Sequence, residues 1–289
     1  MVLDSLPKLK LEKIKIKKDR TFCAIILNAK TSLGEIKLLG KEAKYWVKSA
    51  LMDIPTKIVD YDKGMSILDA VRGKIDVNYD YTFVLLSTTV LLEEKDISML
   101  KDYATYKGIG LCKLPVGYII CNQYFLDSKN PQVDSVYTGD IDYFYIVENK
   151  KQIKYATEIL QDRINNFHIG NGVEIIKSSS VYIEPEVDIE GGVTIYPHVS
   201  LMGNTKVMEN CIIKDGASIV DSVVGKGSFI GKSVIEKCNI GSNVCIASFC
   251  ELKDSRVGND ATIDSNCSIL KARIKSKEKI KAGSIIEGK

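Results

Sequence analysis

Aliphatic residues recur at every sixth position from Ile183, and the series continues to the end of the chain. The first members are Ile183, Ile189, Ile195, Leu201, Val207, Ile213 and Ile219. The spacing then tightens to five or six residues through Val224, Ile230, Ile235, Ile240, Ile246, Leu252, Val257, Ile263, Ile269, Ile274, Ile280 and Ile286. Helices repeat near 3.6 residues and strands near 2, so neither element alone has this period. The pattern is typical of a hexapeptide β-helix, in which three short strands make one triangular coil around inward aliphatic residues.

Grouped in threes, the aliphatic positions define successive coils that begin at Ile189, Val207, Val224, Ile240, Val257 and Ile274. The five-residue steps fall at similar corners, around Asp221-Ser222, Asp254-Ser255 and Lys271-Ala272. We therefore predict a left-handed parallel β-helix over residues 173–289. Such prisms usually assemble as trimers whose active sites lie at the seams between subunits, so we expect a homotrimer.

The first half predicts strands that alternate with helices. Apolar or amphipathic runs indicate strands at Phe22–Leu27, Lys57–Val59 and Thr82–Leu86, and helices at Lys41–Met52, Ser66–Arg72 and Glu94–Tyr106. This alternation predicts a three-layer α/β domain with a mostly parallel sheet over residues 1–150. Ligands of such sheets bind outside the carboxyl ends of the strands, so the loops after Leu27 and Leu86 are the expected place for chemistry.

A helix over Lys151–Phe167 is predicted by an apolar face made of Ile153, Ala156, Leu160, Ile164 and Phe167. Gly170 and Gly172 are expected to end it. Residues 151–172 therefore form an arm between the two predicted domains.

Charge and cysteine content narrow the class of protein. Forty basic residues against 37 acidic ones leave a net charge of +3, which argues against nucleic-acid and membrane-surface partners. We find no apolar stretch of about 18 residues and no signal peptide. Eight cysteines without a CxxC pair favour a reducing cytoplasm. Cys250 and Cys267 should stack on adjacent coils as small packing residues, with a metal site or disulfide as the alternative.

The basic run Lys8–Lys18, KLKLEKIKIKK, nearly alternates apolar residues with lysines. This alternation predicts a half-exposed strand, with a phosphate-binding arm as the alternative.

The segment Gln161–Thr205 contains QDRIN, NGVEI and VYIEPEVDIEGGVTIYPHVSLMGNT. Together with Val147-Glu148-Asn149 and Lys37-Leu38-Leu39-Gly40-Lys41, it resembles the bacterial bifunctional enzyme family that makes UDP-N-acetylglucosamine. Members join an N-terminal uridylyltransferase to a C-terminal hexapeptide acetyltransferase. The resemblance implies Mg²⁺ for the first activity, acetyl-CoA for the second, and a sugar nucleotide as ligand.

The chain departs from this family at the uridylyltransferase motifs. The loop Asn28–Glu35 has one glycine and no arginine where the family has a glycine-rich phosphate loop. Thr88 stands where the resemblance places the magnesium aspartate, and a hydroxyl is a poor Mg²⁺ anchor. Lys37, Gly117 and Asn149 remain at matching positions. The domain is also short, with about 150 residues where the resemblance implies roughly 230. We therefore predict a shortened domain with a vestigial nucleotide-sugar pocket at Lys37, Thr88, Gly117 and Asn149, in which magnesium-dependent transfer is lost; a surface lysine before a helix is the alternative for Lys37.

The acetyltransferase motifs of the family are also missing. Its catalytic histidine lies in a later coil, whereas the only histidines here are His168 in the arm and His198 in the first coil. Both are expected to be structural or surface residues. The chain ends at Lys289, before the coils that complete the acetyl-CoA pocket in the family. We therefore assign no residues of this chain to a cofactor.

Other residues offer rival sites. Asp140 and Asp142, with Glu148 and Asn149, could hold a relocated metal, and Asp60 and Asp62 form a second acidic pair; solvated turn residues are the alternative for both pairs. Four corner lysines either pair across a trimer or are simply solvated: Lys226, Lys232, Lys237 and Lys253.

Two hypotheses on function follow. The first is a non-catalytic or regulatory relative of the uridylyltransferase/acetyltransferase, which binds a nucleotide sugar or acts as a scaffolding trimer in cell-envelope metabolism. The second is a transferase of altered specificity, a nucleotidyltransferase or acyltransferase for a sugar phosphate or sugar nucleotide, which uses the Asp140 cluster or His198.

Overall fold

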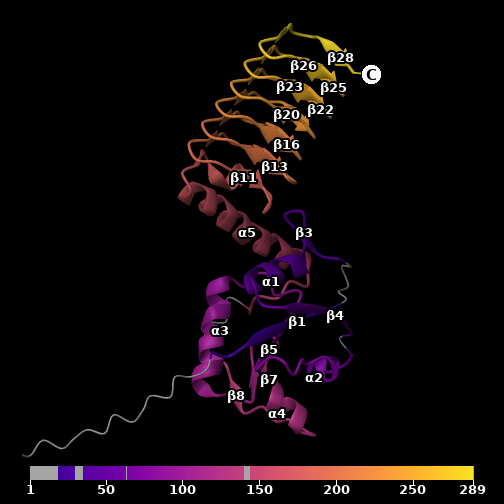
Figure 1. Cartoon of the computed structure of the whole chain (residues 1–289), viewed down its shortest axis with the longest axis vertical. Coiled ribbons are helices and arrows are strands. Elements are labelled where there is room, and N and C mark those ends of the chain that lie inside the picture. The colour runs from indigo at the N-terminus through magenta and orange to yellow at the C-terminus, as the bar shows by residue number, and fades with distance from the viewer. Residues whose placement is uncertain (1–18, 30–34, 63, 140–143, 289) are drawn as a thin grey trace, which may run out of the picture. The chain divides into compact units, whose positions relative to one another are not determined.

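The computed structural model describes residues 19–29, 35–62, 64–139 and 144–288 (Figure 1). The predicted strand over Lys8–Lys18 lies outside these residues. The described chain divides into two compact units. The first comprises the described residues within Met1–Ala29, Lys48–Ser87 and Leu92–Tyr143, and the second those within Lys30–Val47, Thr88–Leu91 and Phe144–Lys289. The second unit thus takes in two short segments from the first half of the sequence.

The first unit is built on a six-stranded sheet, in the order β4-β1-β5-β7-β6-β8. Its strands are β1 (Phe22–Ala29), β4 (Thr56–Tyr61), β5 (Tyr81–Leu86), β6 (Leu111–Lys113), β7 (Tyr118–Cys121) and β8 (Ser135–Val136). The central strand β1 is parallel to β4 and β5, as expected for an apolar run buried on both faces. The sequence did not predict the antiparallel hairpin of β6 and β7, which extends the sheet beyond β5.

Helices cover both faces of this sheet, which confirms the α/β class. Alternate residues of β1 and β5 pack with α2 (Ile67–Val71) and α4 (Asn122–Asp127) in one apolar cluster. The other face carries Phe22, whose ring stacks on those of Tyr81 and Phe83 at centroid distances of 5.4 Å. Here α3 (Glu94–Lys107) packs, and the Tyr81 hydroxyl donates to the Ala104 carbonyl at 3.4 Å.

The second unit begins with a small layer that packs on the arm helix α5 (Lys150–Gly170). The layer contains the hairpin of β2 (Lys37–Leu38) and β3 (Lys41–Glu42), and the start of α1 (Ala43–Leu51). The Trp46 ring nitrogen donates to the Leu38 carbonyl at 3.2 Å. The predicted helix over Lys41–Met52 therefore starts two residues later, because Lys41 and Glu42 pair as a strand. Gly170 lies inside α5, and Gly172, with φ +87°, follows its end.

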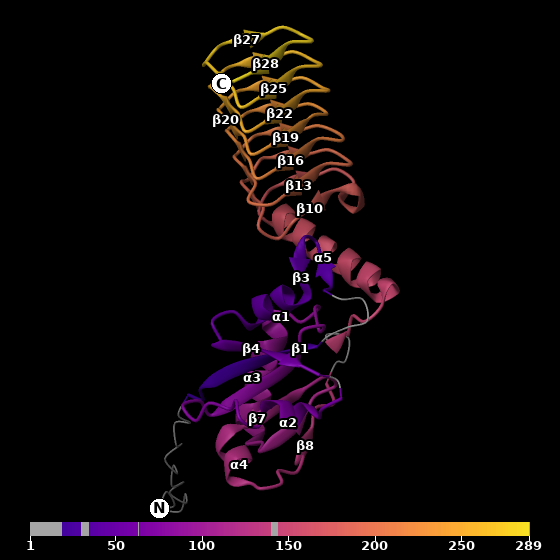
Figure 2. The ribbon, with the colours of Figure 1, turned by 90° about the vertical axis from the view of Figure 1, so that its right-hand side faces the viewer.

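The rest of the second unit is a parallel β-helix with three sheets, stacked coil on coil (Figure 2). This architecture confirms the left-handed β-helix of hexapeptide repeats that the spacing of the aliphatic residues predicted. A short 3-10 helix, Ser178–Ser180, lies near its start. The strands are β9 (Glu174–Ile175), β10 (Tyr182–Ile183), β11 (Asp188–Ile189), β12 (Thr194–Ile195), β13 (Ser200–Met202), β14 (Lys206–Val207), β15 (Ile212–Ile213), β16 (Ser218–Val220), β17 (Val223–Val224), β18 (Phe229–Ile230), β19 (Val234–Glu236), β20 (Asn239–Ile240), β21 (Cys245–Ile246), β22 (Glu251–Lys253), β23 (Arg256–Val257), β24 (Thr262–Ile263), β25 (Ser268–Leu270), β26 (Arg273–Ile274), β27 (Lys279–Ile280) and β28 (Ile285–Glu287).

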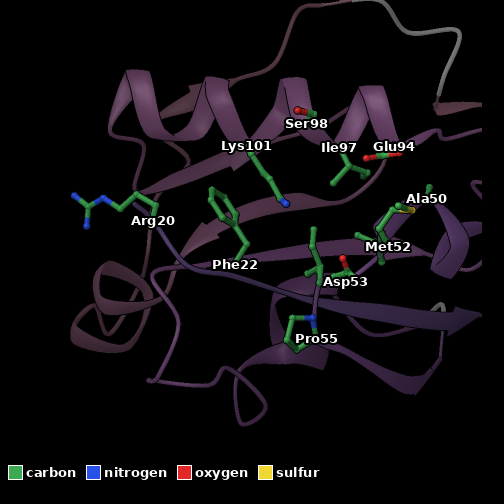
Figure 3. A pocket seen from close by; sticks show the side chains of 12 residues that line it. Arg20, Phe22, Ala50, Met52, Asp53, Pro55, Glu94, Ile97, Ser98 and Lys101 are labelled. Atoms are coloured by element: carbon green, nitrogen blue, oxygen red, sulfur yellow. The ribbon is translucent and has the colours of Figure 1, made fainter. Parts of the chain in front are cut away.

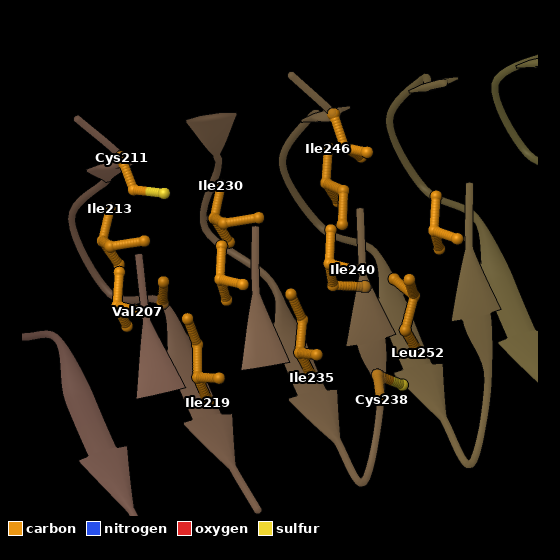
Figure 4. Close-up of a cluster of buried hydrophobic side chains, with 14 of the residues drawn as sticks. Val207, Cys211, Ile213, Ile219, Ile230, Ile235, Cys238, Ile240, Ile246 and Leu252 are labelled. Carbon is orange, nitrogen blue, oxygen red and sulfur yellow. The ribbon is translucent and has the colours of Figure 1, made fainter. Parts of the chain in front are cut away.

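The inward positions match the aliphatic series of the sequence (Figure 4). The six predicted coil starts fall in register on one sheet, where Ile189 pairs with Val207 and the pairing continues to Ile274. Every aliphatic member of the series is buried except Ile286, which is half-buried at the last coil.

Three of the five-residue steps, at the corners named above, close with a left-handed residue followed by a buried side chain. Asp221, Asp254 and Lys271 have φ between +47° and +49°. The hydroxyl of Ser255, which follows Asp254, donates to the Lys253 carbonyl at 2.7 Å and accepts from the Ala272 amide at 3.0 Å. This hydroxyl satisfies two backbone groups that the tight corner would otherwise leave unpaired.

Cys250 and Cys267 are both buried in the core of the prism, as the packing interpretation predicts. Each thiol donates to a carbonyl of the next coil, Cys250 to Asp264 at 3.1 Å and Cys267 to Lys281 at 3.2 Å. The two thiols therefore connect adjacent coils by hydrogen bonds. Among the described helices, none is both long and apolar enough to cross a lipid bilayer.

Candidate functional site

The carboxyl edge of the α/β sheet, where chemistry was expected, places Asn28 beside Asp60. The two residues are in register at the ends of β1 and β4, and the Asn28 amide donates to Asp60 at 3.1 Å. Asp62 instead accepts from the Gly64 amide at 3.0 Å, which is a local turn contact. The acids of this pair therefore have separate structural partners. Residues 30–34 of the expected phosphate loop lie outside the described residues.

Lys37 lies on the exposed hairpin of β2 and β3 in the second unit. Its ammonium nitrogen is 4.0 Å from Glu35, and in the hairpin it pairs with Glu42. Hydrogen bonding from Lys44 is the main reason that the pKa of Glu42 lies below its usual value, and the Lys37 charge adds to this effect. Lys37 thus lies among acids rather than at a preformed anion site.

Thr88 and Asn149 are far apart in the sequence, but their backbone segments lie side by side. The Thr88 carbonyl accepts a hydrogen bond from the Val147 amide at 3.0 Å. Thr88 is buried. Asn149 is the N-cap of α5: its side-chain oxygen accepts from the Gln152 amide at 3.0 Å, and the Gln152 side chain accepts from the Asn149 amide at 3.2 Å. This reciprocal capping box uses the side chain that the resemblance assigns to a metal-binding segment.

Gly117 lies in the first unit, at the turn between β6 and β7. Its φ is +96°, and a Cβ atom there would lie 2.0 Å from the Val84 carbonyl oxygen. The close approach of the hairpin to β5 is therefore a sufficient reason for glycine at this position.

Asp140 and Asp142 lie outside the described residues. Within the part of the chain that the structure describes, no three His, Cys, Asp or Glu residues are grouped so that they could hold a metal ion. The relocated metal site stays a prediction.

The two histidines have different environments. His168 is buried in the last turn of α5, and burial is the main cause that lowers its pKa. His198 is exposed at a corner of the prism, where its Nδ1 lies 2.9 Å from an Asp215 carboxylate oxygen. An aspartate on one ring nitrogen fixes the tautomer and orientation of an imidazole, which is the arrangement of a general base.

The sequence analysis did not identify Asp215 as the partner of His198, although the length of one coil predicts which residue lies beside it. Asp215 follows His198 by 17 residues, close to the length of one coil, so the two side chains meet at the same corner. The same spacing pairs lysines with acids inside the chain: Lys226 with Glu209, and Lys253 with Glu236 at 3.0 Å. These two corner lysines therefore have partners in their own chain, which weakens the prediction that they pair across a trimer.

A stripe of apolar side chains runs up one face of the prism. Ile212, Phe229 and Cys245 are in register on β15, β18 and β21, and point outward. Phe249, 65% exposed, and Val234, 49% exposed, lie at the neighbouring corner and strand. We call Ile212, Phe229 and Cys245 the apolar stripe.

Comparison with known proteins bears on the second half of the chain. Residues 204–288 match the family model described as "GlmU-like, C-terminal hexapeptide". A bifunctional protein GlmU from Clostridium beijerinckii is 37% identical over 129 residues, which are 44% of this chain and 28% of that protein. Another, from Clostridioides difficile, is 31% identical over 163 residues, or 56% of this chain and 36% of that protein. The coils of this chain are GlmU-like.

This similarity spans about a third or less of the GlmU proteins that match. It supports the resemblance found in the coils and does not extend it to the whole chain. A GDP-perosamine N-acetyl transferase from Caulobacter crescentus, solved with CoA and GDP-perosamine, aligns over 92% of this chain and 93% of its own. Its sequence identity is 12% and the TM-score 0.35, which is too low to establish a shared fold.

Proposed function

We propose that this chain is a non-catalytic relative of the GlmU proteins, a trimeric scaffold whose shortened first half is a vestigial nucleotide-sugar-binding domain. The observation that best supports this is the capping box of Asn149. The resemblance assigns Asn149 to the metal-binding segment, yet its side chain caps helix α5. Thr88, at the expected aspartate position, is buried and carries no charge. The Asn149 side chain thus serves the fold, and Thr88 offers no charge to a metal ion.

Magnesium does not fit the residues that are described at these positions. Mg²⁺ binds through carboxylates and phosphates in octahedral geometry, and neither Thr88 nor Asn149 supplies a carboxylate. We therefore derive no step through this ion.

The trimer in this proposal rests on the apolar stripe. A phenylalanine, an isoleucine and a cysteine in one outward ladder make a continuous apolar surface on three successive coils. Association with further copies of the same prism would remove these outward apolar side chains from water, which is favourable. The corner lysines Lys226, Lys237 and Lys253 already have acidic partners in their own chain and need none from another copy.

A second function is favoured by the His198–Asp215 pair. In this alternative, the chain is an acyltransferase of altered specificity, with Asp215 orienting His198 so that its Nε2 deprotonates a hydroxyl or amine. With acetyl-CoA and an amino-sugar phosphate whose amine accepts the acetyl group, the variants His198→Gln and Asp215→Asn would both lose the acceptor-dependent release of CoA. The released CoA is measured by chromatography, because thiol reagents would also react with the exposed Cys245. Equal CoA release by both variants and the unaltered protein would eliminate this function.

Thermal unfolding in the presence of candidate ligands tests the main proposal. UDP-N-acetylglucosamine, UTP and acetyl-CoA are each added with and without Mg²⁺. A ligand at 100 times its dissociation constant stabilises the folded state by about 2.7 kcal/mol, which shifts the transition measurably. The proposal predicts a shift with the uracil nucleotides that is the same with and without Mg²⁺. A shift that requires Mg²⁺ would contradict it, because it would restore the metal site.

A further inference from the structure

A cavity of about 320 Å³ lies at the amino edge of the sheet in the first unit, opposite the carboxyl edge where chemistry was expected (Figure 3). Its walls come from the end of α1, the segment Met52–Pro55, the start of β1 and one side of α3. The volume is within the range of about 300–1,000 Å³ that small-molecule sites have. None of Lys37, Thr88, Gly117 and Asn149 lines it.

The cavity has an apolar floor within a lining that is otherwise largely polar. Leu51, Ile54 and Ile97 line it and are buried in the unit. Phe22 adds a half-buried ring, which is held in place by stacking on Tyr81 and Phe83. A fixed aromatic ring beside aliphatic side chains offers an apolar body a rigid contact surface.

Around this floor are three charged side chains without an oppositely charged partner among the described residues: Lys101, which is half-buried, and the exposed Asp53 and Glu94. Lys101, Asp53 and Glu94 line the cavity, and none of them forms an ion pair or hydrogen bond with another described residue. The Lys101 ammonium lies 5.8 Å from the centre of the Phe22 ring. Figure 3 shows Lys101 reaching toward the middle of the cavity, with Asp53 and Glu94 on the side away from Arg20. Arg20, by contrast, is held by Asp80 at 3.0 Å.

We propose that this cavity binds a small zwitterion with an apolar body, of the class of free α-amino acids with apolar side chains. Lys101 holds the carboxylate of the ligand, Asp53 and Glu94 hold its ammonium group, and its side chain packs on Phe22 and Ile97. Charges of both signs beside an apolar floor match the three parts of such a molecule, and the paired charges compensate each other when water leaves. The inference is independent of the proposed function, since no residue of the expected nucleotide-sugar pocket takes part.

Calorimetric titration of the full chain separates the parts of the ligand. The probes are L-phenylalanine, 3-phenylpropionate, which lacks the ammonium group, and 2-phenylethylamine, which lacks the carboxylate. We expect L-phenylalanine to bind at least tenfold more tightly than either analogue, which corresponds to about 1.4 kcal/mol. An analogue that binds as tightly as L-phenylalanine, or no heat with any probe at millimolar concentrations, overturns the proposal.

Substitutions test whether L-phenylalanine binds in this cavity. Lys101→Met and Asp53→Asn should each weaken L-phenylalanine binding at least tenfold, whereas Lys107→Met, an exposed lysine on the same helix outside the cavity, should leave it unchanged. Ser98→Phe adds a ring at the exposed rim and should block binding without removing a buried contact. Circular dichroism confirms that each variant is folded. Undiminished binding by folded Lys101→Met or by Ser98→Phe overturns the proposal.

Discussion

Gly117 shows how a residue that resembles part of a binding motif has a structural reason of its own. Its φ is positive, and a Cβ added to it would lie 2.0 Å from the Val84 carbonyl oxygen, so any side chain requires the β6–β7 hairpin to shift. A glycine at the matching position is therefore weak support for ligand binding in this chain.

Gly117→Ala should lower the free energy of unfolding by more than about 2 kcal/mol, since it combines a strained backbone with a clash against backbone. Urea unfolding measures this loss. Gly108→Ala is the matched control, because Gly108 also has a positive φ, +61°, but faces open space. Equal losses in the two variants would show that the Val84 contact is unimportant.

His168 makes the stability depend on pH. Burial lowers its pKa in the folded state below the ordinary value of 6.5, so the unfolded chain binds more protons between the two values. The free energy of unfolding should therefore be highest above pH 6.5 and fall as the pH drops below it. Denaturant unfolding at several pH values should show this fall, and His168→Gln should remove it. His198→Gln, at the exposed histidine, should leave the fall in place; the opposite pattern would contradict the assignment.

The residue contacts that the sequence analysis missed are those that join neighbouring coils. The environment of His198 depends on Asp215, 17 residues away, and only the coil length relates the two. Likewise, the hydroxyl of Ser255 is useful because the Ala272 amide of the next coil reaches it at 3.0 Å. Both partners could be found once the repeat was assigned, but the left-handed backbone at His198, with φ +58°, could not.

At the scale of elements, the arm helix α5 depends on its N-terminal capping box. The side chain of each of Asn149 and Gln152 accepts a hydrogen bond from the backbone amide of the other. A helix start otherwise leaves such amides unpaired.

Asn149→Ala should destabilise the second unit by about 1 kcal/mol through loss of this cap. Asn149→Asp should retain the stability, because aspartate caps a helix as well as asparagine does. Chemical denaturation of the two variants measures the difference. If Asn149→Ala unfolds like the unaltered protein, the structural role that we assign to Asn149 is wrong.

Element boundaries were predicted best where an apolar run or an amphipathic pattern covered most of the element. The strand over Phe22–Leu27 extends only two residues further, to Ala29, and α3 ends one residue beyond its prediction. The hairpin of β6 and β7 was missed because its strands have three and four residues, too few to show a period. The helix over Lys41–Met52 was predicted too long, because antiparallel pairing of its first two residues prevailed over the helical pattern.

For the whole molecule, the proposed trimer depends on the apolar stripe. Phe229→Asp should convert the trimer to a monomer, since it introduces a charge into the middle of the stripe. Sedimentation velocity at micromolar concentration distinguishes the two states. Asn239→Asp adds a charge in the same region on another sheet and should leave the trimer intact. A stable monomer of the unaltered protein would refute the trimer itself.

The architecture of the second half could be predicted from sequence because one repeat determines every inward position. The function could not, because the residues that distinguish a working site from a vestigial one occupy loops and helix ends. The resemblance assigns Lys37, Thr88 and Asn149 to positions of the expected pocket, yet their contacts are an acidic neighbour, a buried backbone pairing and a helix cap. Only the structure reveals these contacts.

The central proposal is that the chain, whose coils are GlmU-like, carries out no magnesium-dependent uridylyl transfer. The most direct measurement is pyrophosphate release from UTP and N-acetylglucosamine 1-phosphate in the presence of Mg²⁺. We predict release no faster than in the absence of protein. Magnesium-dependent release above that background, abolished by Lys37→Met but retained in a control such as Lys107→Met, would contradict the account.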